Sequence, residues 1–551
     1  MDKSTAEHME QEKPMDFTSD AHVLSTVAEG RDLLDVVPKL DKPWYRYPHL
    51  LKLNLLLLAP IFAQVVSGYD GSMMNGLQDV AVWQSYFNYP LGQRLGTMNN
   101  AVTIGTLVIT PFTSYITDFL GRKRTLILGC FVILIGAAIQ GAAQNFGMFI
   151  GGRVLLGVGS CISSVAAGPW LIECAYPAQR GAVTSFLLAS WSFGSFLAAL
   201  VTWGSFNGSL VNSSWSWRVP SILQGFLPLV QICIASFAPE SPRWLVSKGR
   251  HREARHFFTK YHAAGDENHL IVSYQMAEIE ATLEEEKVQK MSSWVQWVKT
   301  SAMRHRFFIV LIIPMMLQFE GNALISYYLH IILDNIGITS SIEQLKINLG
   351  NTVFSLVCAV IAASCADKFR RRTFFLSGLI SMLVCYIIWT VLSAIDEEHN
   401  NMSRGLSIGV ILFIFLYSGV NNICAVIGTP YVMEVTPYSL RAKASTIYQV
   451  TGNIAGFYNN YVNPIAMVAI TWKYYIVWIC MLGVWIVMVY FVFPETSGHS
   501  LEEVDEVFGG GLNSGRDAIK SMVAKKSLEK TVDSTVMDTL HLNEPDEKTF
   551  A

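Results

Sequence analysis

Two charged residues stand inside long apolar stretches of the sequence, and they are the first candidates for chemistry. Asp70 lies in a Gly-Tyr-Asp-Gly segment of one apolar run, and Arg153 lies in another. A carboxylate inside a membrane costs about 2.5–3.5 kcal/mol on insertion scales, so it normally has a partner or a function. We predict that Asp70 and Arg153 form an ion pair, which is either a permanent structural contact or one that breaks during a functional cycle.

A stripe of polar side chains follows one face of the apolar segment between residues 307 and 333. Gln318, Asn322 and Ser326 are four residues apart, which places them on one side of a helix. These groups either bind a ligand rich in hydroxyl groups or form hydrogen bonds between helices. Aromatic rings that could stack on such a ligand, or simply pack, and further amides that could contact it are Trp191, Tyr327, Tyr328, Asn421, Asn422, Gln449, Asn453, Asn459 and Asn460.

Glu320 interrupts this stripe with a carboxyl group. It is a second protonatable group, a ligand for a substrate hydroxyl or the mark of a changed substrate, and the sequence leaves all three open. The sequence has no Ser/His/Asp set, phosphate-binding loop or cluster of metal ligands, and His330 stands alone. We therefore expect no enzymatic activity, cofactor or metal. The nine cysteines lie in or beside apolar segments, where they act as small packing residues.

The elements that must position these residues are membrane helices. Half of the chain is hydrophobic (51%) and only 15% is charged, whereas a soluble chain has about 25% charged residues. A helix needs about 20 mostly apolar residues to cross a bilayer. Twelve segments qualify, near residues 50–73, 95–117, 125–143, 147–172, 184–204, 218–238, 307–333, 347–366, 373–394, 407–431, 445–470 and 474–493.

Orientation follows from the short loops that carry Lys and Arg, because such loops stay in the cytosol. The loops after the second, eighth and tenth segments are basic, which places both termini in the cytosol, and the alternate loops hold few cations. Three Asn-x-Ser/Thr sequons, at Asn207, Asn212 and Asn401, fall in the loops assigned to the outside and are predicted glycosylation sites. The polar residues 1–41 precede the first apolar run, so we expect a disordered tail and no cleavable signal peptide. The net charge of −3 gives no indication of a nucleic-acid partner.

The two halves of the chain repeat three patterns at nearly constant offsets. An acidic and basic loop follows the second and eighth segments, an acid and an Arg seven residues apart follow the fourth and tenth, and Pro-Glu-Ser or Pro-Glu-Thr follows the sixth and twelfth. This repeat indicates two related six-helix halves. We expect the acids and bases to form a cytosolic gate that pairs only when the halves close on that side. The gate residues are Asp118, Arg122, Glu173, Arg180, Asp367, Arg371, Glu434 and Arg441.

Five motifs carry a family resemblance, and each lies in the loop or helix where the repeat places it. They are Asp118-x-x-Gly121-Arg122-Lys123, Gly152-Arg153, Glu173-x-x-x-Pro177-x-x-Arg180, Pro239-Glu240-Ser241 and Pro494-Glu495-Thr496. With them the chain resembles the sugar porter family of the major facilitator superfamily from about Lys42 to Phe508. Residues 42–54 and 455–466 are similar to fungal lactose permeases and cellodextrin transporters.

The resemblance implies an all-α membrane protein of twelve helices in two six-helix halves. The expected units are the tail 1–41, a first half 42–239, a cytosolic loop with short helices 240–306, a second half 307–493 and a cytosolic tail 494–551. It also implies a monomeric importer in a fungal plasma membrane that carries a sugar, such as lactose or cellobiose, together with a proton. Asp70 and Arg153 would be the proton-coupling pair, opened by protonation of Asp70.

Several positions depart from the family pattern. Leu188 replaces a Gln of many hexose porters, Thr429 lies near an expected Trp, and Arg370 replaces a loop glycine. Asn322 appears one place earlier than usual, with Ala323 after it. These departures keep two alternatives open: a transporter of another small polyol, organic acid or secondary metabolite, and a non-transporting sugar receptor.

Overall fold

The computed structural model describes residues 42–206, 212–289, 294–365, 369–398, 404–437 and 440–496, and every regular element in these ranges is a helix. The first half contains α3 (Pro48–Leu56), α4 (Leu58–Gln78), α5 (Ala81–Tyr86), α6 (Gln93–Leu120), α7 (Arg122–Gly141), α8 (Phe146–Cys174), α9 (Arg180–Phe206), α10 (Trp215–Leu223) and α11 (Phe226–Phe237). The second half contains α16 (Ser301–Gln318), α17 (Asn322–Asn335), α18 (Ser341–Cys365), α19 (Arg371–Glu398), α20 (Arg404–Val435), α21 (Arg441–Ile470) and α22 (Tyr474–Val492).

These helices make twelve membrane crossings within the described residues, as the hydropathy pattern predicts. Nine apolar stretches are long enough to cross a bilayer, and one of them, Lys443–Val492, holds both α21 and α22. These stretches account for ten crossings. A further crossing is α9, which is bent by 42° between Thr184 and Ala189. The remaining one is α6, which spans 28 residues but includes Pro111 and several Asn and Thr residues, and is therefore less apolar. Continuous helices are required because unpaired backbone groups are costly in lipid.

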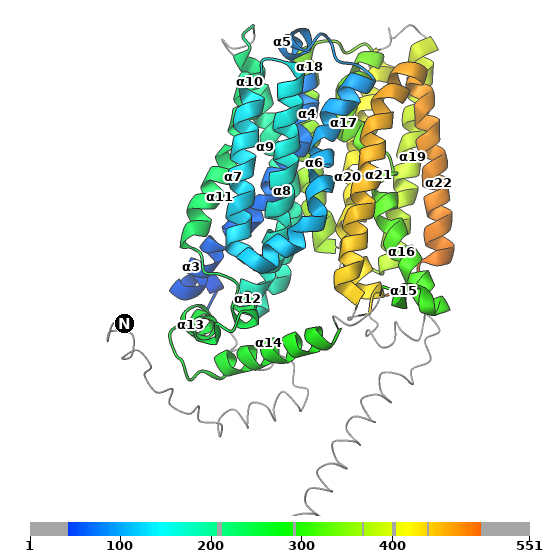
Figure 1. Cartoon of the computed structure of the whole chain (residues 1–551). Coiled ribbons are helices and arrows are strands. Elements are labelled where there is room, and N and C mark those ends of the chain that lie inside the picture. Colours follow the sequence, from blue (N-terminus) through cyan, green and yellow to red (C-terminus); the bar gives the residue numbers. More distant parts are fainter. Residues whose placement is uncertain are drawn as a thin grey trace, which may run out of the picture.

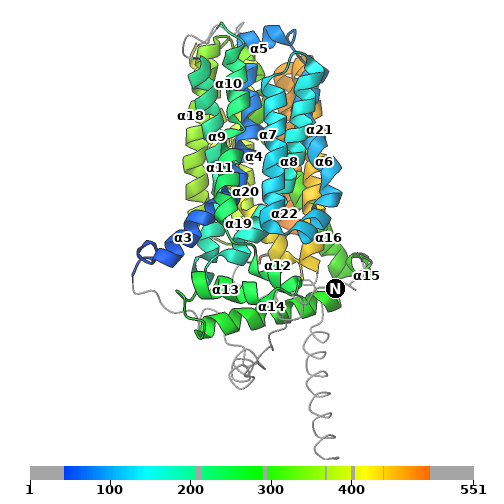
Figure 2. The ribbon, with the colours of Figure 1, turned by 60° about the vertical axis from the view of Figure 1, so that its left-hand side comes forward.

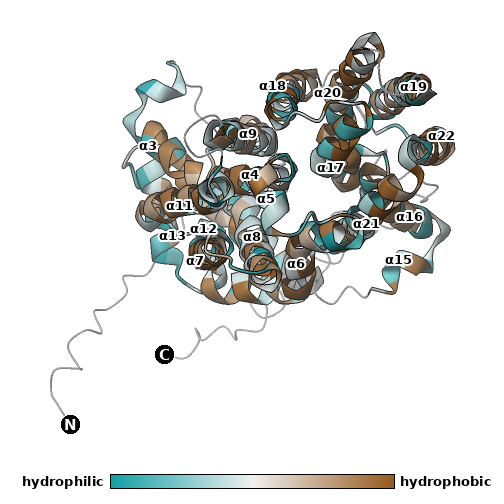
Figure 3. Cartoon of the chain, turned by 90° about the horizontal axis from the view of Figure 1, so that it is seen from above, coloured by the Kyte–Doolittle hydropathy of each residue, from teal (hydrophilic) through white to brown (hydrophobic). Residues whose placement is uncertain are grey.

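The helices form two groups that lie side by side when the bundle is viewed along its axis (Figure 3). The two groups touch mainly where α9 packs on α18 and where α6 packs on α21. Short helices α12 (Pro242–Ser247), α13 (His251–Tyr261) and α14 (Leu270–Gln289) lie beyond one end of the first group (Figures 1 and 2). We call this end the loop end, and the opposite end, where α5 lies, the α5 end.

Close helix contact brings α9 against α4 beside Asp70. A Cβ on Gly68 of α4 would stand 2.0 Å from the carbonyl oxygen of Trp191, and a Cβ on Gly194 of α9 would stand 2.0 Å from that of Val65. Only glycine permits this approach, which is how helices commonly pack in a membrane. The contact fixes Trp191 at the level of Asp70.

A break between α16 and α17 interrupts the seventh crossing at Phe319–Gly321, where Gly321 has a φ of +99°. At the break, four consecutive carbonyl groups each accept a hydrogen bond from a side chain of a different helix. The bonds run from Asn459 to Gln318 (2.6 Å), Trp485 to Phe319 (3.0 Å), Tyr417 to Glu320 (2.9 Å) and Tyr386 to Gly321 (3.0 Å). Irregular backbone at membrane depth is tolerated because the surrounding protein satisfies it.

Candidate functional site

Asp70 and Arg153 come together in the interior of the first half. Arg153 Nη1 of α8 lies 3.6 Å from Asp70 Oδ1 of α4, and the two residues are 1% and 4% exposed. Arg153 Nε also donates to the carbonyl oxygen of Met98 at 3.0 Å. Gln224, at the end of α10, donates its amide to Asp70 Oδ1 at 2.7 Å. The pairing agrees with the sequence prediction, whereas Gln224 was missed because a single amide inside an apolar run gives no distinctive signal.

A polar cavity lies between the two halves at the level of this pair. A chamber of 410 Å³ is bordered by Trp191 of α9 and, across from it, by Gln318, Glu320 and Asn322 of the second half. A smaller chamber of 60 Å³ shares Trp191 and Asn322 with it and is lined by Ser326. Hydroxyl and amide groups that complete the two walls are Ser72, Asn75, Ser192, Ser195, Asn348, Asn351, Thr352, Ser355, Ser418, Asn421 and Asn422. The combined volume is within the usual range of small-molecule sites.

Residues near Asp70 connect the ion pair to this cavity. A Cβ on Gly71 would lie 3.7 Å from both the Trp191 ring and the Tyr327 hydroxyl. Ser72 lines the smaller chamber, and its hydroxyl accepts a hydrogen bond of 2.7 Å from Ser195. The residues directly after Asp70 in α4 therefore lie beside groups that a ligand in the cavity would touch.

Other predicted binding residues have different positions. Asn459 supports the broken helix through its bond to the Gln318 carbonyl, and Tyr328 is fully buried with its hydroxyl on the carbonyl oxygen of Asn460 at 2.6 Å. Asn453, Asn459, Asn460, Tyr327 and Tyr328 are not among the residues that border the two chambers. Small polar residues on α4, α9 and α18 take their place, and the sequence reasoning missed these because isolated Ser and Asn residues also occur in helix packing.

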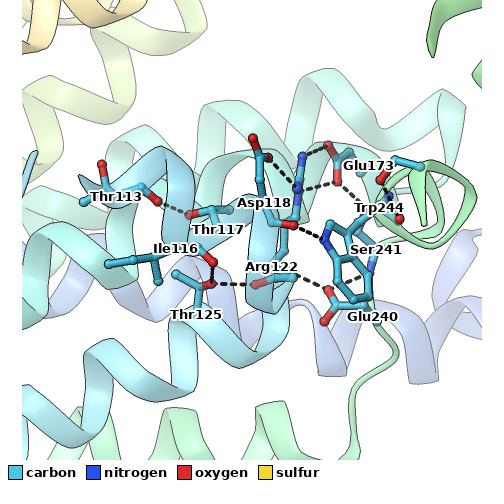
Figure 4. A network of polar contacts seen from close by, with 12 residues as sticks. Thr113, Ile116, Thr117, Asp118, Arg122, Thr125, Glu173, Glu240, Ser241 and Trp244 are labelled. Carbon is cyan, nitrogen blue, oxygen red and sulfur yellow. Dashed lines mark hydrogen bonds and ion pairs between the residues drawn. The ribbon is translucent and has the colours of Figure 1, made fainter. Parts of the chain in front are cut away.

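The charged residues at the loop end of the first half form one network (Figure 4). Arg122 lies 3.3 Å from Glu173 and 3.6 Å from Asp118, and Ser241 donates to Glu173. Glu240 accepts hydrogen bonds from the backbone N–H groups of Arg122 and Lys123, at 2.9 and 3.0 Å. The Pro-Glu-Ser motif therefore caps the first turn of α7, where an acid is favoured.

The second half repeats this arrangement. Arg371 lies 3.1 Å from Glu434, Thr496 donates to Glu434 at 2.6 Å, and Glu495 accepts from the backbone N–H of Arg372 at 3.2 Å. In this state both networks form within one half, and the pairing between the halves that is expected when they close at this end stays a prediction. Each network forms within its half because the repeated motifs bring each acid beside the Arg of its own half.

The remaining gate residues lie at the starts of two helices or outside the described residues. Arg180 begins α9, and Arg441 begins α21 with its Nε 3.4 Å from the carbonyl oxygen of Thr436. Asp367 lies outside the described residues.

The α5 end is closed by polar contacts between the halves. His330 of α17 lies 3.2 Å from Asp79 and 2.8 Å from Gln84 of the first half, and 3.2 Å from Asp334 of its own helix. Gln78 donates to the carbonyl oxygen of Tyr327 at 2.8 Å. His330 therefore does not stand alone, and its partners in the first half were missed because they lie about 250 residues away in the chain.

Toward the loop end the cavity is not closed in this way, because the larger chamber extends to Arg371 at the start of α19. With the α5 end joined and the chamber reaching toward the loop end, the structure faces the loop end. A wider cavity of 710 Å³ lies beside α12 and α13 and borders neither the ion pair nor the polar stripe.

Two of the three sequons and one family departure lie outside what the structure describes. Asn212 is exposed in the turn before α10, near the α5 end, whereas Asn207 and Asn401 are outside the described residues. The Leu188 side chain is not described either, and Thr429 donates to the Tyr448 hydroxyl at 3.4 Å.

Twelve membrane crossings among the described residues, in two repeated halves around a polar cavity, define a multi-pass membrane transporter. Residues 56–508 match the family model described as "Sugar (and other) transporter". The chain belongs to the sugar porter family of the major facilitator superfamily, and it is a transporter rather than an enzyme.

Individual relatives are distant. The chain is 28% identical to the MFS-type transporter oryC of Aspergillus oryzae, over 80% of this chain and 82% of that protein. It is 27% identical to the low-affinity glucose transporter HXT1 of Saccharomyces cerevisiae, over 82% of this chain and 79% of that protein. The inward-open structure of the xylose transporter XylE from E. coli superimposes with a TM-score of 0.68 at 19% identity, covering 83% of this chain and 99% of that one, which supports the fold.

Proposed function

We propose that this protein imports a sugar, such as the disaccharides lactose or cellobiose, together with a proton by alternating access. We place it as a monomer in the plasma membrane, with the loop end and both termini in the cytosol. The observation that carries this proposal is the buried Asp70–Arg153 pair beside a cavity walled by amides, hydroxyls and Trp191. Such a wall suits a sugar, which presents hydroxyl groups for the amides and an apolar face for the ring.

Proton coupling follows from the energetics of the pair. Arg153 and the amide of Gln224 are placed to stabilise Asp70 when it is a carboxylate. A proton on Asp70 would remove the charge that Arg153 neutralises and weaken the contact between α4 and α8. Because α4 also lines the cavity through Ser72 and Asn75, loosening this contact would alter the wall that holds the sugar.

The charged networks at the loop end support the alternation between states. In this state each network is complete within its own half. We propose that Arg180, Arg441 and the exposed Asp118 join the halves when the loop end closes, which would favour the state open at the α5 end.

Uptake by a yeast strain that lacks its own sugar transporters tests the proposal. Labelled lactose, cellobiose, glucose and xylose are supplied with and without a protonophore, to cells that express the wild type or Asp70→Asn. The variant should abolish accumulation against a gradient and retain downhill exchange, while Asp266→Asn, in the exposed turn before α14, should behave as the wild type. Concentrative uptake by Asp70→Asn at the wild-type level would refute the coupling.

Glu320 favours a second candidate, a transporter of another small polyol, organic acid or secondary metabolite. Gln318 and Asn322, the polar wall residues on either side of it in the chain, are amides, so this carboxyl is compatible with a substrate other than a sugar. If none of the four sugars enters the cells, this candidate replaces the first. A sugar receptor that does not transport would bind a sugar without carrying any label across the membrane.

A further inference from the structure

Glu320 is the one acidic side chain among the described residues that border the larger chamber. It stands at the break between α16 and α17, between the cavity residues Gln318 and Asn322. The residue is only 1% exposed, and its Oε2 has no hydrogen-bond partner. A deeply buried acid with a free oxygen beside a ligand cavity has an unfilled contact.

The side chains around Glu320 do not fill that contact. The titratable groups that face it are Tyr386 of α19, Tyr417 and Cys424 of α20 and Tyr448 of α21. The first two donate their hydroxyls to the main-chain carbonyls of Gly321 and Glu320, and so are not available to the carboxyl.

A cation on the wall of the same chamber has an acid of its own. Arg371 borders the same chamber, but its guanidinium lies 3.1 Å from Glu434. Among the described ion pairs none includes Glu320, whereas Asp70 has Arg153. Glu320 is thus an acid in the membrane interior without the compensation that its counterpart in the first half receives.

The lack of a paired cation makes the charge of Glu320 depend on what fills the chamber. A buried carboxylate without a cation costs about 2.5–3.5 kcal/mol, so the neutral form is favoured while the chamber is dry. When water or a polar ligand fills the chamber, the charged form is solvated and the cost falls. A group placed at such a boundary exchanges its proton with the water of the chamber as the chamber fills and empties.

We propose that Glu320 is a second proton-binding group of this transporter and contacts the transported substrate. The neutral carboxyl donates its O–H to an oxygen of the substrate, and loss of that proton to water in the chamber removes the donor. Protonation of Glu320 therefore sets substrate affinity, whereas Asp70 sets the coupling of transport to the proton gradient. This inference rests on the proposed role of the cavity as the substrate site.

Exchange transport separates the two acids because it needs no net proton movement. The test uses whichever of the four labelled sugars is exchanged fastest. Its half-saturating concentration is measured between pH 5 and pH 8 in Asp70→Asn and in Asp70→Asn/Glu320→Gln. Asp70→Asn should bind about 3- to 10-fold more weakly at high pH than at low pH, as expected for one hydrogen bond. Glu320→Gln should remove this dependence, because its amide donates at every pH. An equal pH dependence in both proteins, or none in Asp70→Asn, would overturn the proposal.

Two further measurements keep the test decisive. If Glu320→Gln yields no monodisperse protein, Glu320→Ser supplies a small hydroxyl donor and the same flat pH response is expected. If no sugar is exchanged, infrared difference spectra of the purified protein after a pH step report the carboxyl directly. A protonated-carboxyl band that remains in Asp70→Asn and disappears in Glu320→Gln supports the proton-binding group even if the sugar assignment fails. A spectrum unchanged by Glu320→Gln refutes it.

Discussion

His330 joins the two halves at the α5 end, and replacing it should shift the balance between the conformations of the transporter. His330→Ala removes the contacts to Asp79 (3.2 Å) and Gln84 (2.8 Å) of the first half. Hydrogen bonds that involve charged groups contribute about 1.5–3 kcal/mol each and neutral ones about 0.5–1.5 kcal/mol. Burial raises the pKa of Asp79 to about 6, so this acid can take up a proton when its partner is lost, which limits the cost.

We therefore expect His330→Ala to destabilise closure of the α5 end by about 2 kcal/mol, a factor of about 30. A state open at the α5 end that is populated at about 1% would rise to nearly a quarter of the molecules, on the order of 23%. Such a change is large enough to appear as a second population in a distance distribution.

Spin labels at Leu91 and Glu343, on exposed sites of the two halves near this end, would report the change by double electron–electron resonance. The exposed Cys233 and Cys480 are first replaced by Ala. Asp334→Asn is the matched control, because Asp334 contacts His330 only within the second half and is 39% exposed on its side chain. A distribution in His330→Ala that matches the control would refute the reasoning.

Two further predictions concern the loop end. Gly121 has a φ of +93°, and a Cβ there would lie 2.6 Å from Glu240 Oε2, so Gly121→Ala should cost about 1–3 kcal/mol and lower the thermal midpoint measured by fluorescence size exclusion. Gly181→Ala, which meets no atom within 4 Å, should leave the midpoint unchanged, and equal midpoints for both variants would contradict the strain. Burial lowers the pKa of His262 to about 4, so the unfolded chain takes up this proton near pH 6.5 and the folded protein only near pH 4. The free energy of unfolding should fall as pH drops below 6.5, by up to about 3 kcal/mol near pH 4. His262→Gln should therefore reduce the difference in thermal midpoint between pH 5 and pH 7. An undiminished difference would exclude His262 as its source.

Local sequence information was sufficient for the membrane helices because each crossing must satisfy its own backbone hydrogen bonds and bury about 20 apolar residues. The limits of α8, α9 and α21 therefore lie within a few residues of the predicted segments. The break before α17 was not predicted, although Gly321 lies there, because the carbonyl groups at the break are satisfied by residues such as Trp485, which is 166 residues away.

The charged residues show the same division between local and distant information. An acid and an Arg inside apolar runs must be compensated, so Asp70 and Arg153 could be paired from their types and depths alone. The choice of partner at the loop end could not be made in this way, because Arg122 contacts two acids from different helices, Asp118 and Glu173.

The sequence by itself determined the class of protein, the number of crossings, the internal repeat and the pairing of Asp70 with Arg153. All of these follow from the cost of placing polar groups in lipid, which acts on each segment separately. Only the tertiary structure decided which polar groups face a cavity and which support a helix. Asn322 and Asn459 have the same side chain, but Asn322 borders the larger chamber, whereas Asn459 donates to the Gln318 carbonyl at the helix break. The tertiary structure also decided that His330 joins the halves and that Glu320 has no ion pair among the described residues, because both depend on residues brought together from distant parts of the chain.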